Sequence, residues 1–369
     1  MELSPVELRH ILHKNPETAY SEFATTKTII DSIKALPGAE EAFKFIAPLE
    51  TGVLIEYTVN NDEYLLFRAD IDALLIKEQT DWEYGSLNQN MHACGHDVHT
   101  SSLYGLIKYV LENKIKRNLL FLFQPAEESG GGAMRFFDTG IFDNYKIKNA
   151  FALHVTDEYD KGIIGSTSGV LFASALELNI DFTGVSAHVA FPQNGKNALS
   201  ALRLFMDAAD KLPRNIGEPS IIGMGKIAAG DVRNIAPGWA RLEGSIRALS
   251  VEKANAIFNK LQDILKGVEL QTGVNSLLQR LVHYPEVIVN ADLFKKYEAV
   301  LSQKYKFIDC SYKMTGEDFG LFSRKYPSFM FWLGTSTGER YGLHNPHFLP
   351  DDSIVNLAVS IWIDILNNS

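Results

Sequence analysis

The chain has 369 residues, of which 46% are hydrophobic and 22% charged, and its formal net charge is −10. This length exceeds one ordinary domain, and the composition is typical of a globular protein with a sizeable core. The acidic balance argues against nucleic acid or an anionic membrane as partner, because both favour clustered Lys and Arg. No apolar run approaches the roughly 18 residues of a transmembrane helix, and the charged N-terminus lacks the apolar core of a signal peptide. We therefore expect a cytoplasmic protein whose two cysteines, Cys94 and Cys310, stay reduced.

Short apolar runs alternate with helical patterns from residue 53 to residue 154. The runs are "VLIEYT", "YLLFRAD", "NLLFLFQ" and "AFALHV", and between the second and third of them apolar residues recur at helical spacing. After about residue 287 the same texture returns, with "SFMFWLGT" as a buried strand and a last helix after Asp351. This alternation predicts an α/β fold in which helices cover both faces of a sheet.

The segment from 174 to 286 has a different pattern. "ALELNIDFT" alternates strictly between apolar and polar residues, as a half-buried strand does. A helix at about 197–212, strands near 220–228 and 240–249, a helix at about 251–268 and a strand at "VNSLLQRLVHY" follow. This β-α-β-β-α-β order predicts a ferredoxin-like, or split βαβ, domain. We therefore expect one domain of residues 1–173 and 287–369, with residues 174–286 inserted in it as a second domain.

Polar side chains stand where several predicted strands end. "YLLFRAD" ends at Asp70, "NLLFLFQPAEE" at Glu127 and Glu128, and "NAFALH" at His154. In open α/β sheets, ligands bind outside the carboxyl ends of the strands, so we expect these side chains in one crevice. The stretches "NMHACGHDVHTSS" and "LHNPHF" add one cysteine and further histidines to the same set.

This combination of side chains predicts a metal site. Imidazole, thiolate and carboxylate are ligands of Zn²⁺ and of its neighbours Co, Ni and Mn. The candidates exceed what one tetrahedral ion takes, so we expect two divalent ions that share a bridging ligand. One of the adjacent glutamates would bind metal while the other takes a proton from water, and the residues alone leave the order open. The alternative is a polar turn that opens a helix, and a lone buried cysteine or histidine is more often an inert core residue than a ligand.

Nine short motifs carry a resemblance to a known family. They are, in order from residue 68 to residue 348, "RADIDAL", "MHACGHDVH", "FQPAEE", "ALHV", "GVSAHVAFP", "RNIAP", "GSIR", "MTGEDFG" and "GLHNPHF". Together with "HKNPETAYSEFAT" near the start, they resemble the aminoacylase/carboxypeptidase-type metallopeptidases, in the branch of small-molecule amidohydrolases. One departure is Leu75, which stands where the family commonly has proline. The resemblance implies a mixed-sheet metallohydrolase catalytic domain with the inserted domain as lid and dimerisation domain.

The resemblance also implies a role for each matching position. Cys94 would be a bridging thiolate in a site for two metal ions, whose other ligands would be His96, Glu128, His154 and His344. Glu127 would be the general base and Asp70 a supporting catalytic residue. In the inserted domain, His188 would reach the active site, in related dimers that of the partner subunit, and Asn234 and Arg247 would grip the substrate carboxylate. The implied activity is metal-dependent hydrolysis of N-acylated amino acids by a homodimer.

Several alternatives stay open at this point. His347 is the rival of His344 for the last ligand position, and we expect His92 and His99 beside the ligands or at a helix end. Arg247 shares the polar face of its strand with Arg241, so a merely solvated arginine is the alternative there. A catalytically silent metal-binding scaffold is the alternative to an enzyme, and Glu127 argues against it because a binding module needs no general base.

Overall fold

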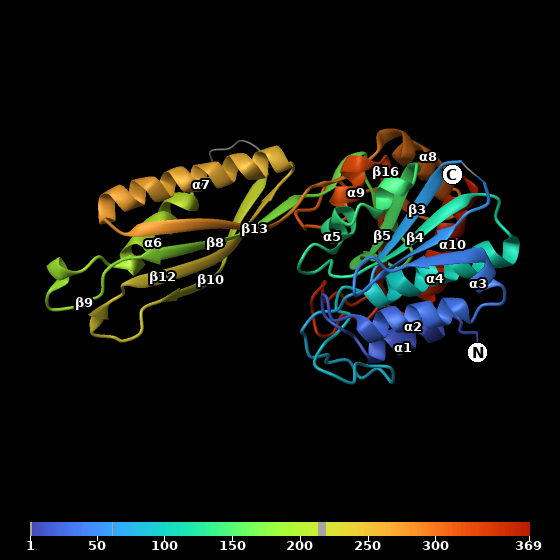
Figure 1. Cartoon of the computed structure of the whole chain (residues 1–369), viewed down its shortest axis with the longest axis horizontal. Helices are drawn as coiled ribbons and strands as arrows, with labels where there is room; N and C mark the ends of the chain where they lie inside the picture. Colours follow the sequence, from blue (N-terminus) through green and yellow to red (C-terminus); the bar gives the residue numbers. More distant parts are fainter. Residues whose placement is uncertain (1, 61, 213–218) are drawn as a thin grey trace. The chain divides into compact units, whose positions relative to one another are not determined.

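The computed structural model describes residues 2–60, 62–212 and 219–369 (Figure 1). Contacts between Cα atoms divide the chain into two compact units. The large unit comprises Met1–Leu171, Ile288–Ser311 and Leu321–Ser369, and the small unit comprises Phe172–Val287 and Tyr312–Gly320. Among the described helices, none is both long enough and apolar enough to cross a bilayer.

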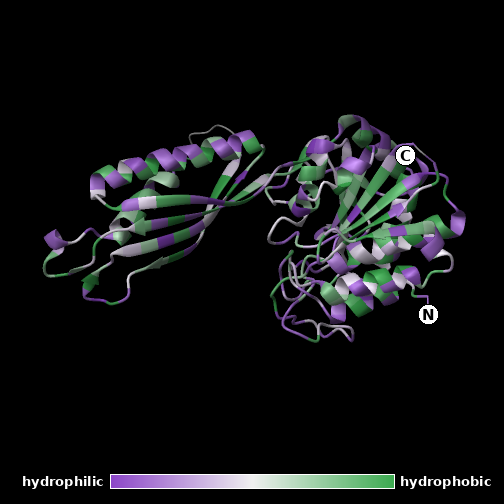
Figure 2. Ribbon diagram, viewed as in Figure 1, coloured by the Kyte–Doolittle hydropathy of each residue, from purple (hydrophilic) through white to green (hydrophobic). Residues whose placement is uncertain are grey.

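A mixed sheet of eight strands forms the centre of the large unit. Its order is β1 (Phe43–Ile46), β2 (Val53–Tyr57), β4 (Asn118–Gln124), β3 (Tyr64–Asp70), β5 (Ile147–Asp160), β16 (Ser328–Ser336), β6 (Ile164–Ser166) and β15 (Phe307–Asp309). Strands β3, β4, β5 and β16 run parallel, while β1 and β2 are antiparallel to their neighbours. Every residue of β4 and β16 is buried, as expected for strands covered on both faces, and Figure 2 shows these central strands as hydrophobic. The predicted α/β fold is confirmed.

Helices pack on both sides of this sheet (Figure 1). They are α1 (Pro5–Lys14), α2 (Phe23–Lys34), α3 (Ala39–Ala42), α4 (His96–Asn113), α5 (Gly132–Asp138), α8 (Ala291–Leu301), α9 (Gly320–Lys325), α10 (Ser353–Asn367) and the 3-10 turn η1 (Ile141–Asn144). Trp362 of α10 packs edge-on against Phe67 and Phe331 of the sheet. Helix α4 packs against both α1 and α10, which buries the whole first turn of α4.

The small unit has the predicted split βαβ arrangement. Its elements are β8 (Ser174–Thr183), α6 (Ala198–Ala209), β10 (Ser220–Ala229), β12 (Trp239–Ala248), α7 (Val251–Thr272) and β13 (Asn275–Tyr284). The strands form an antiparallel sheet in the order β10-β12-β8-β13. Leu176, Leu178, Ile180 and Phe182 of β8 belong to the hydrophobic core that this sheet shares with α6 and α7. The strict alternation in "ALELNIDFT" thus marks the buried face as predicted.

Short elements complete the fold. A two-stranded sheet joins β9 (Ala187–His188) to β11 (Ile235–Ala236), with the 3-10 turn η2 (Pro192–Asn194) close behind β9 in the chain. A second one joins β7 (Gly169–Phe172) to β14 (Val287–Val289). The role of the small unit as a lid or dimerisation domain stays a prediction.

Candidate active site

Residues from four segments of the large unit converge around one sulfur atom. Cys94 Sγ lies 3.4 Å from His154 Nε2 and also 3.4 Å from His344 Nε2. His344 Nε2 in turn lies 3.3 Å from Glu128 Oε2. Cys94 lies two residues before helix α4, Glu128 follows β4 and His344 follows β16. His154 lies within β5, which continues to Asp160, so the predicted strand end at His154 is wrong. The side chains nevertheless meet near the carboxyl ends of the parallel strands, as the fold predicts.

Two groups of ligand atoms share this cysteine. One group contains Cys94, His96 and His154, and the other contains Cys94, Glu128 and His344. Within each group, the ligand atoms all lie within 4.8 Å of one another. A further group joins His96 to both adjacent glutamates, Glu127 and Glu128. The structure therefore brings together all five side chains predicted as ligands, with the predicted base beside them.

Close backbone approach brings the start of α4 to β5. Gly95, the residue before α4, has φ +83°, a left-handed conformation that glycine adopts without strain. A Cβ atom on Gly95 would lie 2.3 Å from Val155 Cγ2, so any larger residue would push Cys94 and His96 away from β5. The backbone N–H of His344 donates to Ala93 O at 2.9 Å, which ties the loop after β16 to the same segment.

Hydrogen bonds orient the ligand imidazoles. His96 Nδ1 donates to the Asp72 carbonyl at 2.9 Å, and His154 Nδ1 donates to the Val155 carbonyl at 2.7 Å, so both rings turn Nε2 toward the site. Asp72 also accepts from the backbone N–H of Glu128 through Oδ2 at 3.0 Å. This second aspartate of "RADIDAL" therefore orients one predicted ligand from each group.

The donor atoms fit a divalent cation. His96 Nε2 and Glu128 Oε1 are buried 3.8 Å apart, and neither makes a hydrogen bond within the described part of the chain. Buried polar atoms in folded proteins nearly always have a partner. A metal ion bound by imidazole, thiolate and carboxylate would satisfy both atoms with its usual ligand types.

The electrostatics of the cluster favour a cation as well. Burial lowers the pKa of His154 to about 3, so its imidazole is neutral and can ligate. Burial opposes ionisation of Glu128, but hydrogen bonding to His344 and the nearby His96 lower its pKa to about 2. Burial and the two glutamate carboxylates raise the pKa of the Cys94 thiol well above its usual range. A thiolate at this position requires added positive charge, which a divalent metal ion supplies.

Asp70 and His99 form a supporting pair beneath the ligands. The backbone N–H of Val155 donates to His99 Nε2 at 2.9 Å, so the ring proton sits on Nδ1 and is donated to Asp70 Oδ1 at 2.6 Å. Both nitrogens of His99 are thus used, and it supports the site instead of ligating metal. Asp70 Oδ2 accepts from Arg68 at 2.7 Å and lies 3.7 Å from His96 Nε2. Burial opposes ionisation of Asp70, but His96, His99 and Arg68 hold its pKa well below the usual range.

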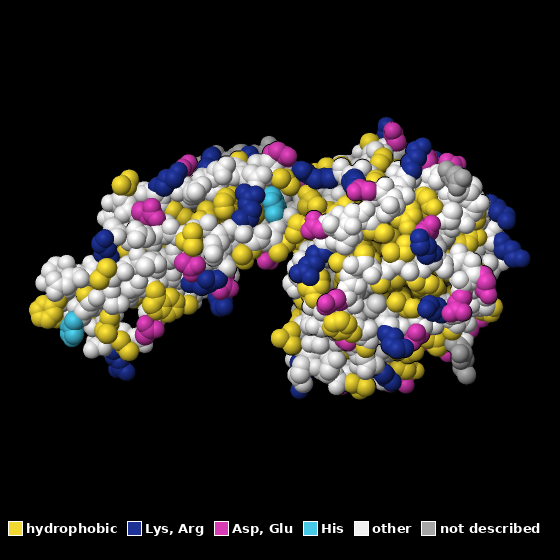
Figure 3. Space-filling view, in the orientation of Figure 1, with side chains coloured by type: hydrophobic (Ala, Val, Ile, Leu, Met, Phe, Trp, Pro, Cys, Tyr) yellow, Lys and Arg dark blue, Asp and Glu magenta, His cyan; other side chains and the backbone are white. Residues whose placement is uncertain are grey.

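Three predicted site residues lie in the small unit. His188 is exposed on β9, next to Asn234, whose carbonyl accepts from Val189 N at 3.1 Å. Exposed apolar side chains belong to the same segments, and Figure 3 shows hydrophobic atoms gathered at this end of the small unit; they are Val185, Val189, Phe191, Val232 and Ile235. Arg247 lies instead on β12, opposite Ala175 of β8. The structure therefore places His188 and Asn234 together and Arg247 apart from them.

The two arginines of β12 differ in their surroundings. Arg241 pairs with Asp181 at 3.0 Å and with Glu243 at 3.1 Å. Arg247 is partly buried, burial lowers its pKa, and it forms no ion pair with any described residue. Arg241 is thus the arginine of this face that is held in ion pairs, whereas Arg247 donates only to the Ile246 carbonyl, at 3.4 Å, among the described residues.

A match to a known protein family identifies the family of this chain. The model of peptidase family M20/M25/M40 matches residues 66–368. The chain belongs to this family. The resemblance inferred from the nine motifs is confirmed, and so is the assignment of the chain as a metal-dependent amidohydrolase.

Individual relatives of this M20 enzyme extend the match to nearly the whole chain. It is 36% identical over 361 residues to the N-acetyldiaminopimelate deacetylase of Exiguobacterium sibiricum, and the match covers 96% of each chain. The Bacillus subtilis YxeP structure is described as a dinuclear metal-binding peptidase of the M20 family. Its sequence is 26% identical to this chain and its TM-score is 0.82, and the match covers 98% of this chain and 96% of the YxeP chain. A putative aminohydrolase from methicillin-resistant Staphylococcus aureus, 22% identical with a TM-score of 0.87, covers 99% of this chain and 95% of its own and shows the same fold.

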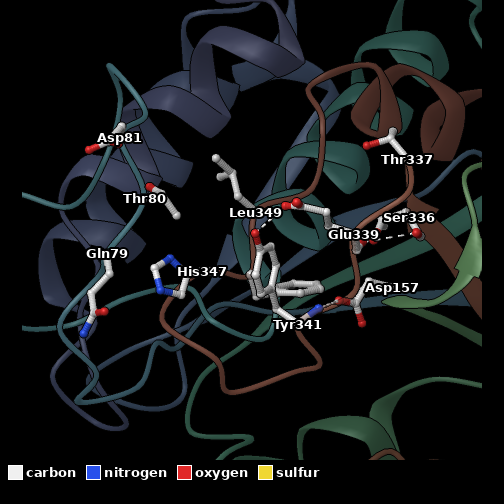
Figure 4. Close-up of a pocket in the computed structure, with 12 residues that line it drawn as sticks. Gln79, Thr80, Asp81, Asp157, Ser336, Thr337, Glu339, Tyr341, His347 and Leu349 are labelled. Carbon is white, nitrogen blue, oxygen red and sulfur yellow. Dashed lines mark hydrogen bonds between the residues drawn. The ribbon is translucent and has the colours of Figure 1, made fainter.

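A polar hollow of about 430 Å³ adjoins the loop that carries His344 in this M20 enzyme (Figure 4). Gln79, Thr80 and Asp81 line one side of it, and residues 335–349 contribute the other. At its floor, Asp157 Oδ2 accepts from the backbone N–H groups of Tyr341 and Gly342 at 2.6 and 2.8 Å. Asp157 therefore fixes the backbone that leads to His344. His347 is exposed in this hollow and belongs to none of the ligand groups.

Sequence reasoning missed some residues that shape the site of the M20 enzyme. Glu22 lies in "HKNPETAYSEFAT", a stretch that carried the resemblance but suggested no role, and its Oε1 accepts from Ala126 N at 2.9 Å. No sequence signal marked Asp157 either, although it follows His154 by three positions in the same strand. His92 is buried but belongs to none of the candidate ligand groups among the described residues, and burial lowers its pKa to about 3.

Proposed function

We propose that this M20 enzyme is an N-acetyldiaminopimelate deacetylase. It would hydrolyse the N-acetyl amide of N-acetyl-diaminopimelate to diaminopimelate and acetate, in the acetyl branch of lysine biosynthesis. The observation that carries the chemistry is the pair of ligand groups that share Cys94, with Glu127 beside them. The choice of substrate is supported by 36% identity to a deacetylase of that name over 96% of both chains.

Two divalent metal ions are part of the proposal. Cys94 would bridge them, and His96, Glu128, His154 and His344 would complete the two sites. The two ligand groups and the buried atoms without hydrogen bonds support this assignment, as does the dinuclear description of the YxeP structure. Imidazole, thiolate and carboxylate suit Zn, Co, Mn and Ni alike, so the ligand set is compatible with each of them.

The residues around the ions would divide the chemical work. The bound ions would polarise the amide carbonyl and make water a better nucleophile at neutral pH. Glu127 accepts the proton of the attacking water and returns it to the leaving nitrogen as the C–N bond breaks, which releases acetate and the free amine. Asp72 holds His96 and the Glu128 backbone in place, and the hydrogen-bonded pair of Asp70 and His99 supports the ligand cluster.

Glu128 is assigned as the ligand and Glu127 as the base because of their neighbours. Glu128 contacts both His344, at 3.3 Å, and His96, at 3.8 Å, and it belongs to a group with the shared cysteine. Glu127 shares a group with His96 and Glu128 but belongs to neither of the two groups that contain Cys94. A general base acts on the water and not as a ligand, and the position of Glu127 beside these two groups supports that role.

The small unit would supply substrate contacts. Arg247 would pair with the α-carboxylate of the substrate, a role that its lack of an ion pair among the described residues supports, and Asn234 would add a polar contact. His188 would reach an active site, as the lid histidine of the partner subunit does in related dimers. The exposed apolar side chains beside His188 support burial of this tip in a homodimer, because such patches mark interaction surfaces.

A panel of three substrates tests the assignment. N-acetyl-diaminopimelate, N-acetyl-methionine and hippurate are assayed for free product amine or glycine at one metal concentration. The proposal predicts that N-acetyl-diaminopimelate exceeds the others in kcat/KM by a wide margin, since a site built to bind a polar group discriminates by up to roughly 10⁴–10⁵-fold against its absence. A flat profile, or a preference for hippurate, would make the protein a general N-acyl-amino-acid amidohydrolase of the aminoacylase or hippurate hydrolase type.

A further inference from the structure

The turn that carries the proposed base has an unusual backbone. Ala126 directly precedes Glu127 and has φ +54°, in the left-handed region that residues with a Cβ rarely adopt. Such a conformation persists only where the surrounding structure holds it, and it is found most often at functional sites. Contacts with the Ala126 peptide must therefore hold it in this conformation.

Two buried carboxylates grip the turn on either side of Glu127. Glu22 Oε1 accepts from the backbone N–H of Ala126 at 2.9 Å. Asp72 Oδ2 accepts from the backbone N–H of Glu128 at 3.0 Å. The residues before and after the proposed base are therefore each fixed by one side-chain oxygen, and Glu22 supplies the oxygen that binds the left-handed residue itself.

Two glycines fix the neighbouring proline by close packing. A Cβ atom on Gly132 would lie 1.7 Å from Pro125 O, and one on Gly52 would lie 2.4 Å from Pro125 Cδ. The N–H of Gly132 also donates to Ala126 O at 3.0 Å. Pro125 thus has little room to move, and the Ala126 N–H depends on Glu22 for its hydrogen bond.

Burial of the Glu22 carboxyl is unfavourable, and hydrogen bonds from Thr51 and from the backbone offset only part of it. The Glu22 side chain is 0% exposed, and Oε2 makes no hydrogen bond within the described residues. Burial, reinforced by the nearby Asp72 carboxylate, raises the pKa of Glu22 to about 7, so burial of its charged form is unfavourable. Glu22 precedes helix α2, but its side chain makes no capping hydrogen bond there. The hydrogen bond from the Ala126 N–H gives this buried carboxyl a partner in the turn that carries Glu127.

We propose that Glu22 is a positioning residue, whose side-chain oxygen holds the Ala126 peptide in its left-handed conformation and thereby aims Glu127 at the reacting water. This inference rests on the proposed role of Glu127 as the base. It assigns Glu22 no contact with substrate or metal. Its effect should appear in the rate of the chemical step, because a displacement of about 1 Å at a catalytic group costs roughly 10²-fold.

Two substitutions separate the hydrogen bond from the volume of the side chain. Glu22→Gln keeps an acceptor oxygen at the same distance from the backbone, whereas Glu22→Met keeps the length and removes the acceptor. We expect Glu22→Met to lower kcat by about 10- to 100-fold with KM and bound metal nearly unchanged. Glu22→Gln should keep kcat within about threefold of the wild type, since the amide oxygen accepts the same hydrogen bond.

A matched control lies at the start of β4, the strand that leads into the turn of Glu127. Asn118 opens β4, is 2% exposed, and its Oδ1 accepts from the backbone N–H groups of Val59 and Asn60 at 2.8 and 3.1 Å. Asn118→Leu removes a comparable buried acceptor, so it should lower Tm while leaving kcat per folded enzyme unchanged. An equal loss of kcat in Asn118→Leu and Glu22→Met would overturn the positioning role in favour of general destabilisation.

A double-mutant cycle shows whether Glu22 acts through Glu127. If it does, Glu22→Met should cause no further loss of kcat in a Glu127→Gln background, because the base it aims is gone. Losses that multiply would overturn the inference. Full activity in Glu127→Gln alone would instead overturn the proposed base, whereas an inactive Glu127→Gln beside an unchanged kcat in Glu22→Met would overturn only the role of Glu22.

Discussion

The predicted site residues of the two units are built in opposite ways. In the large unit, Cys94, His96 and His154 are buried, and the two imidazoles have named hydrogen-bond partners, such as the Asp72 carbonyl for His96. In the small unit, His188 stands exposed on a two-residue strand, and Arg247 forms no ion pair in the described part of the chain. The first group is preorganised by its own unit, while the second has the character of residues that gain their partners only on binding.

This contrast suggests that the two groups affect different steps. A preorganised cluster lowers the barrier of the reaction, because its charges and proton acceptors need no rearrangement. Under the proposed function, His188 and Arg247 would instead contribute through contacts with a ligand or a partner subunit. Changes in the large unit should therefore lower kcat, and changes in the small unit should alter substrate preference and KM.

Removal of metal should give the largest effect. Dialysis against a chelator should abolish amide hydrolysis, because the charge that stabilises a Cys94 thiolate and activates water is lost. Readdition of Zn, Co, Mn or Ni should restore activity. An activity assay and a metal analysis of the same samples measure both effects. Full activity in a preparation verified to be free of metal would contradict the proposed chemistry.

Glu127→Gln should come next in size. Loss of a general base should lower kcat by roughly 10²–10⁴-fold, while the metal content stays that of the wild type. The matched variant Glu128→Gln should lose metal, as judged by elemental analysis after gel filtration. The reverse pattern, with metal lost from Glu127→Gln, would exchange the roles of the two glutamates.

Arg247→Ala tests the small unit. Loss of a bidentate contact to the substrate carboxylate should lower kcat/KM by about 30-fold or more, and most of the loss should appear in KM. The preference for a free α-carboxylate over its amide should disappear in the same variant. Arg241→Ala is the control, since that arginine is engaged with Asp181 and Glu243, and it should leave both quantities unchanged. Equal effects of the two substitutions would contradict the assignment.

The smallest effect concerns stability in the large unit. Burial alone would lower the pKa of His13, but Asp97, 2.9 Å from Nδ1, and Glu78 raise it from 6.5 to about 9. Protonated His13 therefore stabilises the fold fully below pH 6.5, and this stabilisation is lost as the pH rises through 9, a difference of up to about 3 kcal/mol. Tm of the wild type should fall more steeply between pH 6.5 and 9 than Tm of His13→Gln. Parallel curves for the two proteins would contradict the raised pKa.

Patterns local to one strand were predictable from the sequence, and contacts between distant segments were not. Asp70, Glu127 and His154 each follow or end an apolar run, and the rule for strand ends placed them in one crevice. Alternation in β8 likewise marked its buried face. Both predictions depend only on the periodicity of side chains along a strand.

Glu22 illustrates the limit. It is 104 positions away from Ala126, and nothing near either residue in the chain signals that a carboxyl oxygen will meet a left-handed alanine. Arg247 illustrates a second limit. Alternation places Arg241, Glu243 and Arg247 on the same face, but Asp181, the second acidic partner of Arg241, comes from β8, and only the folded sheet reveals the register of β8 with β12.

His344 differs from the other predicted ligands in its exposure to solvent. The other four ligand side chains are buried, whereas the His344 side chain is 52% exposed and sits in a loop at φ +62°. The coordination shell would therefore open to solvent on the side of His344, and the ion held by Cys94, Glu128 and His344 should exchange faster than the ion held by Cys94, His96 and His154. Because both ions would share the sulfur of Cys94 in the proposed site, departure of the first would also change the charge felt by the second, so we expect the two sites to empty in sequence and not independently.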